Sequence, residues 1–232
     1  MKRFWTSVET VPEDGGWAIR LDGRPVRTPA RAALNLPAAA LAQAIAAEWE
    51  AQGEAIDPRT MPMTGFANAT LDHVLPAPGA FRGQIVAYAE SDLLCYRADG
   101  PDPLVARQCA HWDPLLDWAR ATHGVDFAIT AGLLPVDQPA LTLAALRGAV
   151  EALDPWLLAG VATLTQIGGS LVGALALIDG ATQAEALFDA VSLDERWQAE
   201  QWGEDAEAAG HLALRRAAFL DAARYCALVL QS

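Results

Sequence analysis

Lysine is almost absent from this sequence of 232 residues, because Lys2 is the only one. A Walker-type phosphate loop needs a lysine behind its glycines, and Schiff-base catalysis needs a lysine nucleophile. A single lysine at position 2 can serve neither purpose. The sequence therefore excludes a phosphate-loop ATPase and an internal Schiff-base enzyme.

Cysteine is also scarce, and its spacing carries no motif. The three cysteines are Cys95, Cys109 and Cys226, and no Cys-x-x-Cys pair occurs. This spacing excludes a zinc knuckle and a thioredoxin-type redox site. We expect free and mostly buried thiols in a reducing compartment.

Positive charge is the third shortage. Sixteen basic residues face 29 acidic ones, which gives a net charge of −13. Nucleic-acid binding is therefore not expected, because phosphate contacts need clustered cations. Residues 179–207 alone hold nine acids and one base, Arg196, for a net charge of 1 − 9 = −8. This segment is either a solvated helical face or a docking surface for a basic or polar partner.

The longest uncharged run, residues 155–178, has the length of a membrane span. Four glycines and Gln166 interrupt it, and aspartates flank it on both sides. We expect a buried helix pair that breaks at Gly168-Gly169, with Ser170 as an N-cap, and no stable membrane insertion. The first residues turn polar at once and resemble neither a secretory signal nor a transit peptide, which favours a bacterial cytoplasmic protein.

The pattern of the chain predicts an α+β fold in two domains. Residues 1–80 read as a β-rich N-terminal domain with one or two helices, and residues 81–232 as a larger helical domain. The clearest local signal is Asp22-Gly23 between two alternating runs, which predicts a two-residue hairpin. We also expect a strand over Val125–Ile129, and one helix from Asp194 to the C-terminus with a kink at Gly210.

No catalytic constellation stands out. The string Gly168 to Gly173 fits neither a nucleophile elbow, because Val172 replaces a glycine, nor a dinucleotide loop, because Ser170 replaces another. No histidine pair has metal-ligand spacing, and no cofactor is expected. An enzyme with a cleft site between the two domains stays open as an alternative, and would need Asp57, Asp72, Asp92 and His111 to converge.

Eight tryptophans are present, and several stand beside acids, as in Arg196-Trp197 and in Trp202-Gly203-Glu204-Asp205. Such a tryptophan either packs in the core with its indole N–H bonded to a carboxylate, or anchors a protein partner from an exposed position.

Several strings, in order along the chain, together resemble one protein family. They are Leu21-Asp22-Gly23-Arg24-Pro25-Val26-Arg27-Thr28-Pro29, Ala47-Glu48-Trp49-Glu50-Ala51-Gln52, Ile56-Asp57-Pro58, Met61-Pro62-Met63-Thr64, Asp92-Leu93-Leu94-Cys95-Tyr96-Arg97, Trp112-Asp113-Pro114-Leu115-Leu116 with Gln108, Gly169-Ser170-Leu171, and Gln198 through Asp205. The family is the assembly chaperones that attend the alpha subunit of the F-type ATP synthase in mitochondria and alphaproteobacteria.

This resemblance implies a chaperone that has no ATPase cycle and is not an enzyme. It implies binding to the unassembled alpha subunit through the apolar surface that this subunit later gives to its beta neighbour. A family glutamate near a Trp-Gly pair implies a role for Glu204, Asp205 or Glu207, beside Trp202 and Trp197. Members in eukaryotes are mitochondrial, whereas this chain resembles a bacterial member. A purely structural subunit, which would stay in the final assembly, is the remaining alternative.

Overall fold

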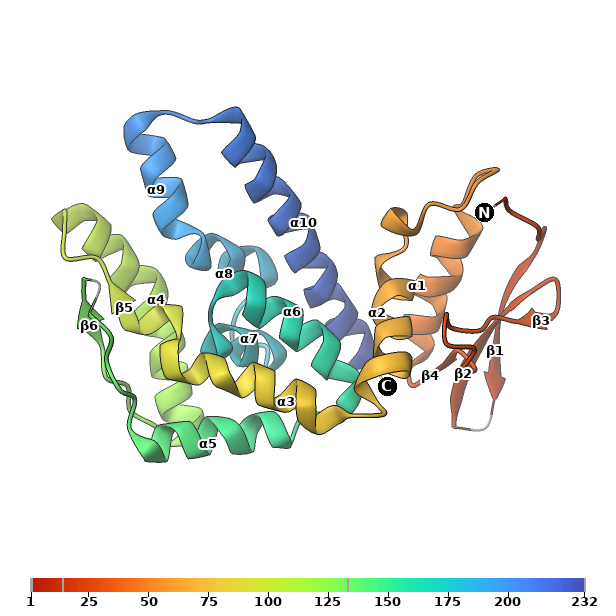
Figure 1. Cartoon of the computed structure of the whole chain (residues 1–232), viewed down its shortest axis with the longest axis horizontal. Coiled ribbons are helices and arrows are strands. Elements are labelled where there is room, and N and C mark those ends of the chain that lie inside the picture. The colour runs from red at the N-terminus through yellow and green to blue at the C-terminus, as the bar shows by residue number, and fades with distance from the viewer. Residues whose placement is uncertain (1, 14, 133, 232) are drawn as a thin grey trace. The chain divides into compact units, whose positions relative to one another are not determined.

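The computed structural model describes residues 2–13, 15–132 and 134–231 (Figure 1). The chain divides into two compact units. Unit 1 comprises Met1–Gly79, Asp154–Gly160 and Arg224–Ser232, and unit 2 comprises Ala80–Leu153 and Val161–Ala223. Asp154–Gly160 and Arg224–Ser232 come from the part of the chain that otherwise forms unit 2. No pattern in the sequence predicts that these two segments belong to unit 1.

Unit 1 contains a small antiparallel sheet. Its strands are β1 Val8–Glu13, β2 Gly16–Leu21, β3 Arg24–Pro25 and β4 Asn35–Leu36, and β2 pairs with each of the others. The predicted hairpin is confirmed, because Asp22 and Gly23 connect β2 to β3 with φ angles of 48° and 75°. Two successive positive φ angles are characteristic of a type I′ turn, whose twist matches the right-handed twist of the two strands that it joins. The Asp22 carboxylate also accepts the backbone N–H groups of Thr6 and Ser7, which lowers its pKa to about 2.

Helices complete unit 1. They are α1 Ala39–Glu50, a 3-10 turn at Pro58–Thr60, α2 Pro62–Ala69 and one wide turn at Thr70–Val74. Glu48 of α1 accepts the N–H groups of Met63 and Thr64 and so caps α2. In the C-terminal segment of unit 1, Arg224–Ser232, the ring of Tyr225 stacks on that of Phe66, with ring centroids 5.0 Å apart.

Unit 2 is almost entirely helical, which confirms the α+β class. Its elements, including three helices (α3, α6 and α10) that extend into unit 1, are α3 Pro78–Ala87, β5 Tyr96–Arg97, α4 Asp102–His123, β6 Thr130–Ala131, α5 Ala140–Glu151, α6 Leu158–Gly168, α7 Leu171–Ile178, α8 Ala184–Val191, α9 Leu193–Trp202 and α10 Ala206–Val229. Short 3-10 turns at Tyr88–Ser91, Leu93–Cys95 and Pro155–Leu157 link them.

The apolar run breaks where the sequence predicts. α6 ends at Gly168, Gly169 has a φ of 66°, and the Ser170 hydroxyl caps α7 by accepting the Gly173 N–H at 2.9 Å. Among the described residues, no helix is both long enough and apolar enough to cross a membrane.

A fully buried carboxylate holds this break together. Asp92 accepts the N–H of Val172 in the first turn of α7 and the N–H of Leu94 in a 3-10 turn. Each of these N–H groups lies in the first turn of a helical segment, where no preceding carbonyl oxygen can accept it, and Asp92 supplies the missing acceptor for both. Burial raises the pKa of Asp92 to about 6.

The thiols largely follow expectation. Cys95 and Cys226 are buried, and burial raises the pKa of each to about 12. Cys109, on α4, is exposed.

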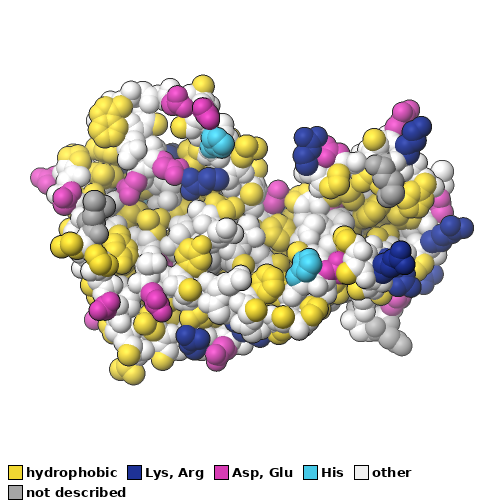
Figure 2. Space-filling model, in the orientation of Figure 1, with side chains coloured by type: hydrophobic (Ala, Val, Ile, Leu, Met, Phe, Trp, Pro, Cys, Tyr) yellow, Lys and Arg dark blue, Asp and Glu magenta, His cyan; other side chains and the backbone are white. Residues whose placement is uncertain are grey.

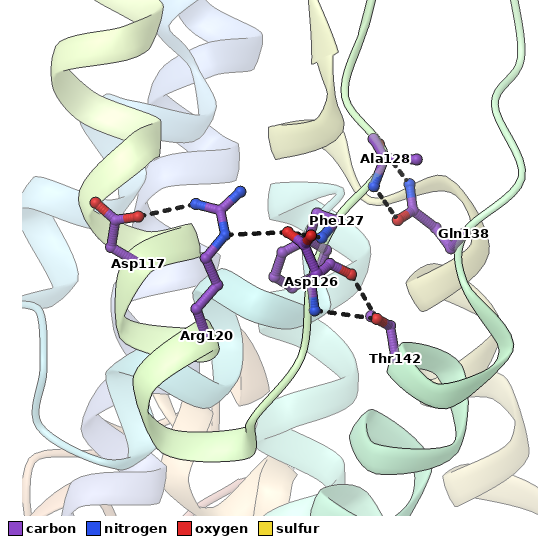
Figure 3. Close-up of polar contacts among 7 residues, drawn as sticks. All are labelled: Asp117, Arg120, Asp126, Phe127, Ala128, Gln138 and Thr142. Atoms are coloured by element: carbon purple, nitrogen blue, oxygen red, sulfur yellow. Dashed lines mark hydrogen bonds and ion pairs between the residues drawn. The ribbon is translucent and has the colours of Figure 1, made fainter.

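The predicted strand over Val125–Ile129 is wrong. Side chains, not a neighbouring strand, satisfy this backbone (Figure 3): both amide atoms of Gln138 bond Ala128, and the Thr142 hydroxyl bonds Asp126. The strand β6 begins only at Thr130, where it pairs with β5 in parallel. Side chains that bond a backbone in place of a neighbouring strand leave no periodic pattern in the sequence, so the sequence could not predict this arrangement.

Candidate partner-docking site

The last two helices form a hairpin, and the prediction of one helix kinked at Gly210 is wrong. α9 ends at Trp202, and α10 begins at Ala206 and passes through Gly210 without a break. The turn is made by Gly203, whose φ of 92° and ψ of 156° suit glycine almost alone. Its N–H still bonds the carbonyl oxygen of Ala199, so the reversal follows directly on the last helical turn.

One face of α9 is fixed to α4. Trp197 is buried in a cluster with Leu193 and Leu104. The Arg107 guanidinium lies over the Trp197 ring at 4.7 Å from its centroid, and it pairs with Glu200 at 2.6 Å. These contacts leave the opposite face of α9 free to line a groove.

A groove of about 810 Å³ lies between α9 and the first half of α10. Most of the first half of α10 is exposed, in contrast to its second half. Trp202 stands in the lining with 77% of its surface exposed. Figure 2 shows acidic side chains gathered over this tip of unit 2. The lining comprises Glu195, Arg196, Gln198, Ala199, Glu200, Trp202, Gly203, Glu204, Asp205, Ala208, Ala209, His211, Leu212 and Arg215.

The charges of the groove differ in how far they are neutralised. Glu195 and Arg215 pair at 2.6 Å, which ties α9 to α10. Asp205 accepts the Ala208 N–H at 2.9 Å and so caps α10. Glu204 has no ion pair among the described residues, so its charge is available to a cationic partner.

The five residues singled out in the sequence take different positions. Trp202, Glu204 and Asp205 line the groove together. Glu207 lies on the first turn of α10, outside the lining, and contacts His211 at 3.8 Å. Trp197 lies on the face of α9 that packs against α4 and is buried there. It is therefore not an exposed anchor for a partner and can act only by positioning α9.

Sequence reasoning missed part of the lining, chiefly Leu212 and Arg215. Both lie on α10, which can face α9 only because the chain reverses at Gly203. The signal that could have revealed this was a glycine directly after Trp202, the usual place for a helix end.

Comparisons with known proteins bear on the whole chain. The family model described as ATP12 chaperone protein matches residues 2–120. The crystal structure of Atp12 from Paracoccus denitrificans is 44% identical, covers 98% of both chains and superposes with a TM-score of 0.95. This chain belongs to the ATP12 chaperone family.

Two further ATP12 relatives agree with this assignment. The structure of an aspartate-to-lysine variant of the Paracoccus protein is 43% identical, with a TM-score of 0.95 over 98% of this chain and 97% of that one. The mitochondrial protein atp12 of Schizosaccharomyces pombe is 23% identical over 214 residues, which are 87% of this chain and 74% of the relative. The groove lies beyond the span of the family model but within the span of the solved structures.

Membership of the ATP12 family makes the chain an assembly chaperone and removes the enzyme alternative. The four residues that the alternative needs have other environments. Asp57 pairs with Arg59 and Asp72 bonds Thr28, both within unit 1, whereas Asp92 is a buried cap in unit 2. His111 is exposed on α4. No group of metal-binding side chains occurs among the described residues.

Two glycine substitutions should have opposite effects on stability. Gly203→Ala should lower the free energy of unfolding by about 1–2 kcal/mol, because alanine fits this φ and ψ poorly. Gly210→Ala should raise it by up to about 1 kcal/mol, because Gly210 lies in a helix interior with open space around it. Urea unfolding of both variants tests this. Equal effects of the same sign would contradict a hairpin that turns at Gly203.

Proposed function

We propose that this chaperone binds the unassembled alpha subunit of the F-type ATP synthase through the groove between α9 and α10. The observation that carries the proposal is Trp202, a large aromatic side chain that is 77% exposed in the lining of an acidic groove. An exposed tryptophan leaves a large apolar surface in contact with water, which is unfavourable, and tryptophans are enriched among the residues that contribute most of the binding energy at protein interfaces.

The groove supplies two kinds of contact to a client. Trp202 and Leu212 offer apolar surface, while Glu204 adds a negative charge at the turn that no ion pair with another described residue neutralises. An apolar client surface with a basic residue at its edge would match both. The charge would speed the encounter, and the apolar contacts would slow release.

Binding of this kind protects the alpha subunit by mass action. A chaperone that holds the free subunit lowers the concentration available for aggregation, and needs no nucleotide for this step. We place the encounter in the bacterial cytoplasm, since the structural relatives are from bacteria. Release follows when the beta subunit competes for the same surface of the alpha subunit.

Capture of purified alpha subunit by the tagged chain tests the proposal. We expect the wild type to retain alpha subunit, and Glu204→Lys/Glu207→Lys to retain about tenfold less at low salt, since both changes place positive charge beside the groove. A matched control is Glu151→Lys/Glu185→Lys, which reverses two exposed acids outside the groove. Equal losses in the two variants would point to net charge and against the groove.

Addition of beta subunit tests the second half of the proposal. The retained alpha subunit should leave the chaperone and appear in an alpha–beta complex. A stable complex that holds chaperone and both subunits would contradict competition for one surface, and would favour a structural role for this chain.

A further inference from the structure

A second charged surface lies on unit 1, and most of it belongs to one of the strings that mark the family resemblance. We define the arginine loop as residues 24–31, which contain Arg24, Arg27 and Arg31, all exposed. Figure 2 shows basic side chains (dark blue) gathered over the strands of this unit. None of the three arginines has an ion pair among the described residues. By contrast, Arg20 pairs with Glu13 and Arg59 pairs with Asp57.

Contacts on its inner side hold the arginine loop in one conformation. The Asp72 carboxylate accepts the Thr28 hydroxyl at 2.6 Å and the Ala30 N–H at 3.0 Å. The Thr28 hydroxyl in turn accepts the Ala32 N–H, and Arg27 forms an antiparallel bridge with Ala33. The three guanidinium groups are therefore presented from a fixed backbone, which reduces the entropy lost when they bind.

The backbone at Arg31 is strained. Its φ is 67°, in the left-handed region that glycine, asparagine and aspartate occupy most readily. The Arg31 carbonyl accepts the Arg27 guanidinium at 3.0 Å, so the two arginines lie close together at the tip of the loop. The turn in which the Arg31 N–H bonds the Thr28 carbonyl oxygen sets this conformation, and glycine would adopt it with less strain. An arginine kept at this exposed position is therefore consistent with a function of its side chain.

The chemistry of this surface points to carboxylates. A guanidinium group matches a carboxylate with two parallel hydrogen bonds. A long polyanion is disfavoured, because the whole chain carries a net charge of −13 and repels it at a distance. A short acidic segment needs only the local field of the loop.

We propose that the arginine loop binds an acidic segment of the client polypeptide and so forms a second contact in addition to that of the groove. The identity of the client rests on the proposed function, whereas binding of an acidic peptide does not. The two contacts carry opposite charge, so a client that fits both must present a basic and an acidic region to the chaperone.

Binding of a fluorescein-labelled peptide of alternating glutamate and serine, followed by anisotropy, tests the proposal directly. Arg24→Glu/Arg31→Glu should weaken binding at least tenfold at low salt. Arg147→Glu/Arg216→Glu changes two exposed arginines of unit 2 by the same net charge and should bind almost like the wild type. Equal weakening in both variants would overturn the proposal, and so would tighter binding of a single-stranded RNA of similar charge.

Arg31→Gly gives a second readout that a merely structural residue would not show. Removal of the strain should lower the equilibrium constant for unfolding by roughly three- to fivefold, after allowance for the extra freedom of glycine in the unfolded chain. The same variant should bind the glutamate peptide several-fold more weakly. A more stable variant with unchanged peptide binding would overturn the proposal.

Capture of alpha subunit separates this proposal from the proposed function. Loss of capture in Arg24→Glu/Arg31→Glu, with the control pair unaffected, supports a client contact at the loop. Unchanged capture in that variant overturns the loop contact and leaves the groove intact. If the wild type itself captures no alpha subunit while it binds the glutamate peptide, the proposed function fails and the carboxylate preference of the loop stands.

Discussion

Trp202→Ala should weaken capture of the alpha subunit by about 30-fold or more and leave the stability of the chaperone unchanged. A tryptophan that becomes buried at the centre of an interface contributes about 2–4 kcal/mol by truncation, which is about 30- to 1,000-fold in affinity. The side chain is 77% exposed in the free chain, so its loss should change the free energy of unfolding by less than about 0.5 kcal/mol.

A control for general loss of surface apolarity comes from the same hairpin. Leu214 is 70% exposed on α10 but does not line the groove. Leu214→Ala should therefore capture alpha subunit nearly as well as the wild type. Titration by surface plasmon resonance, together with thermal unfolding of each variant, measures both quantities. An affinity loss for Leu214→Ala equal to that for Trp202→Ala would move the docking surface away from the groove.

Asp92→Ala should produce the largest loss of stability among the substitutions considered. The substitution leaves the N–H groups of Leu94 and Val172 buried without their acceptor, and each such group costs about 1–3 kcal/mol. A loss of about 3 kcal/mol or more in the free energy of unfolding is therefore expected near neutral pH. The cap Asp154 is a matched control, because it is exposed and accepts one N–H from Trp156. Asp154→Ala should cost about 1 kcal/mol.

The effect of Asp92→Ala should also depend on pH, in a direction set by the raised pKa. The folded protein keeps a proton on Asp92 up to about pH 6, whereas the unfolded chain releases it near the ordinary value of 3.8. Between these values the folded state binds more protons, so this group stabilises the fold at low pH and loses that contribution as pH rises. Asp92→Ala should therefore cost more at pH 5 than at pH 7.5, by on the order of 1 kcal/mol.

Urea unfolding of the wild type, Asp92→Ala and Asp154→Ala at these two pH values measures the dependence. Asp154→Ala serves as the control variant at both pH values. If the cost of Asp92→Ala were greater at pH 7.5 than at pH 5, the carboxylate would be better stabilised in the fold than its burial suggests, and the assigned direction would be wrong.

The sequence could predict what short-range patterns determine. Asp22-Gly23 specifies its hairpin because few dipeptides adopt two successive positive φ angles. Gly168-Gly169 and Ser170 specify the break between α6 and α7 in the same local way. Family likeness in ordered strings then identified the class of protein, which no single motif could do.

The groove could not be predicted to the same extent. Its acids and Trp202 were visible as a cluster, but the last helix was expected to be interrupted at Gly210, whereas the chain reverses at Gly203. The position of the reversal depends on tertiary contacts of α9, such as burial of Trp197 against α4, and composition does not reveal these. The prediction of a strand over Val125–Ile129 was wrong for a related reason, because side chains from later in the chain bond this backbone in place of a neighbouring strand.

The distribution of reactive groups makes this chain a ready instrument for distance measurement. Cys109 in unit 2 is the one exposed thiol, since Cys95 and Cys226 are buried and hold their protons. Lys2 in unit 1 is the only lysine and is exposed, so side-chain amine chemistry is directed to one position. A donor dye on the thiol and an acceptor on the amine would report the separation of the two units by energy transfer, in the free chaperone and with its client, without a single substitution.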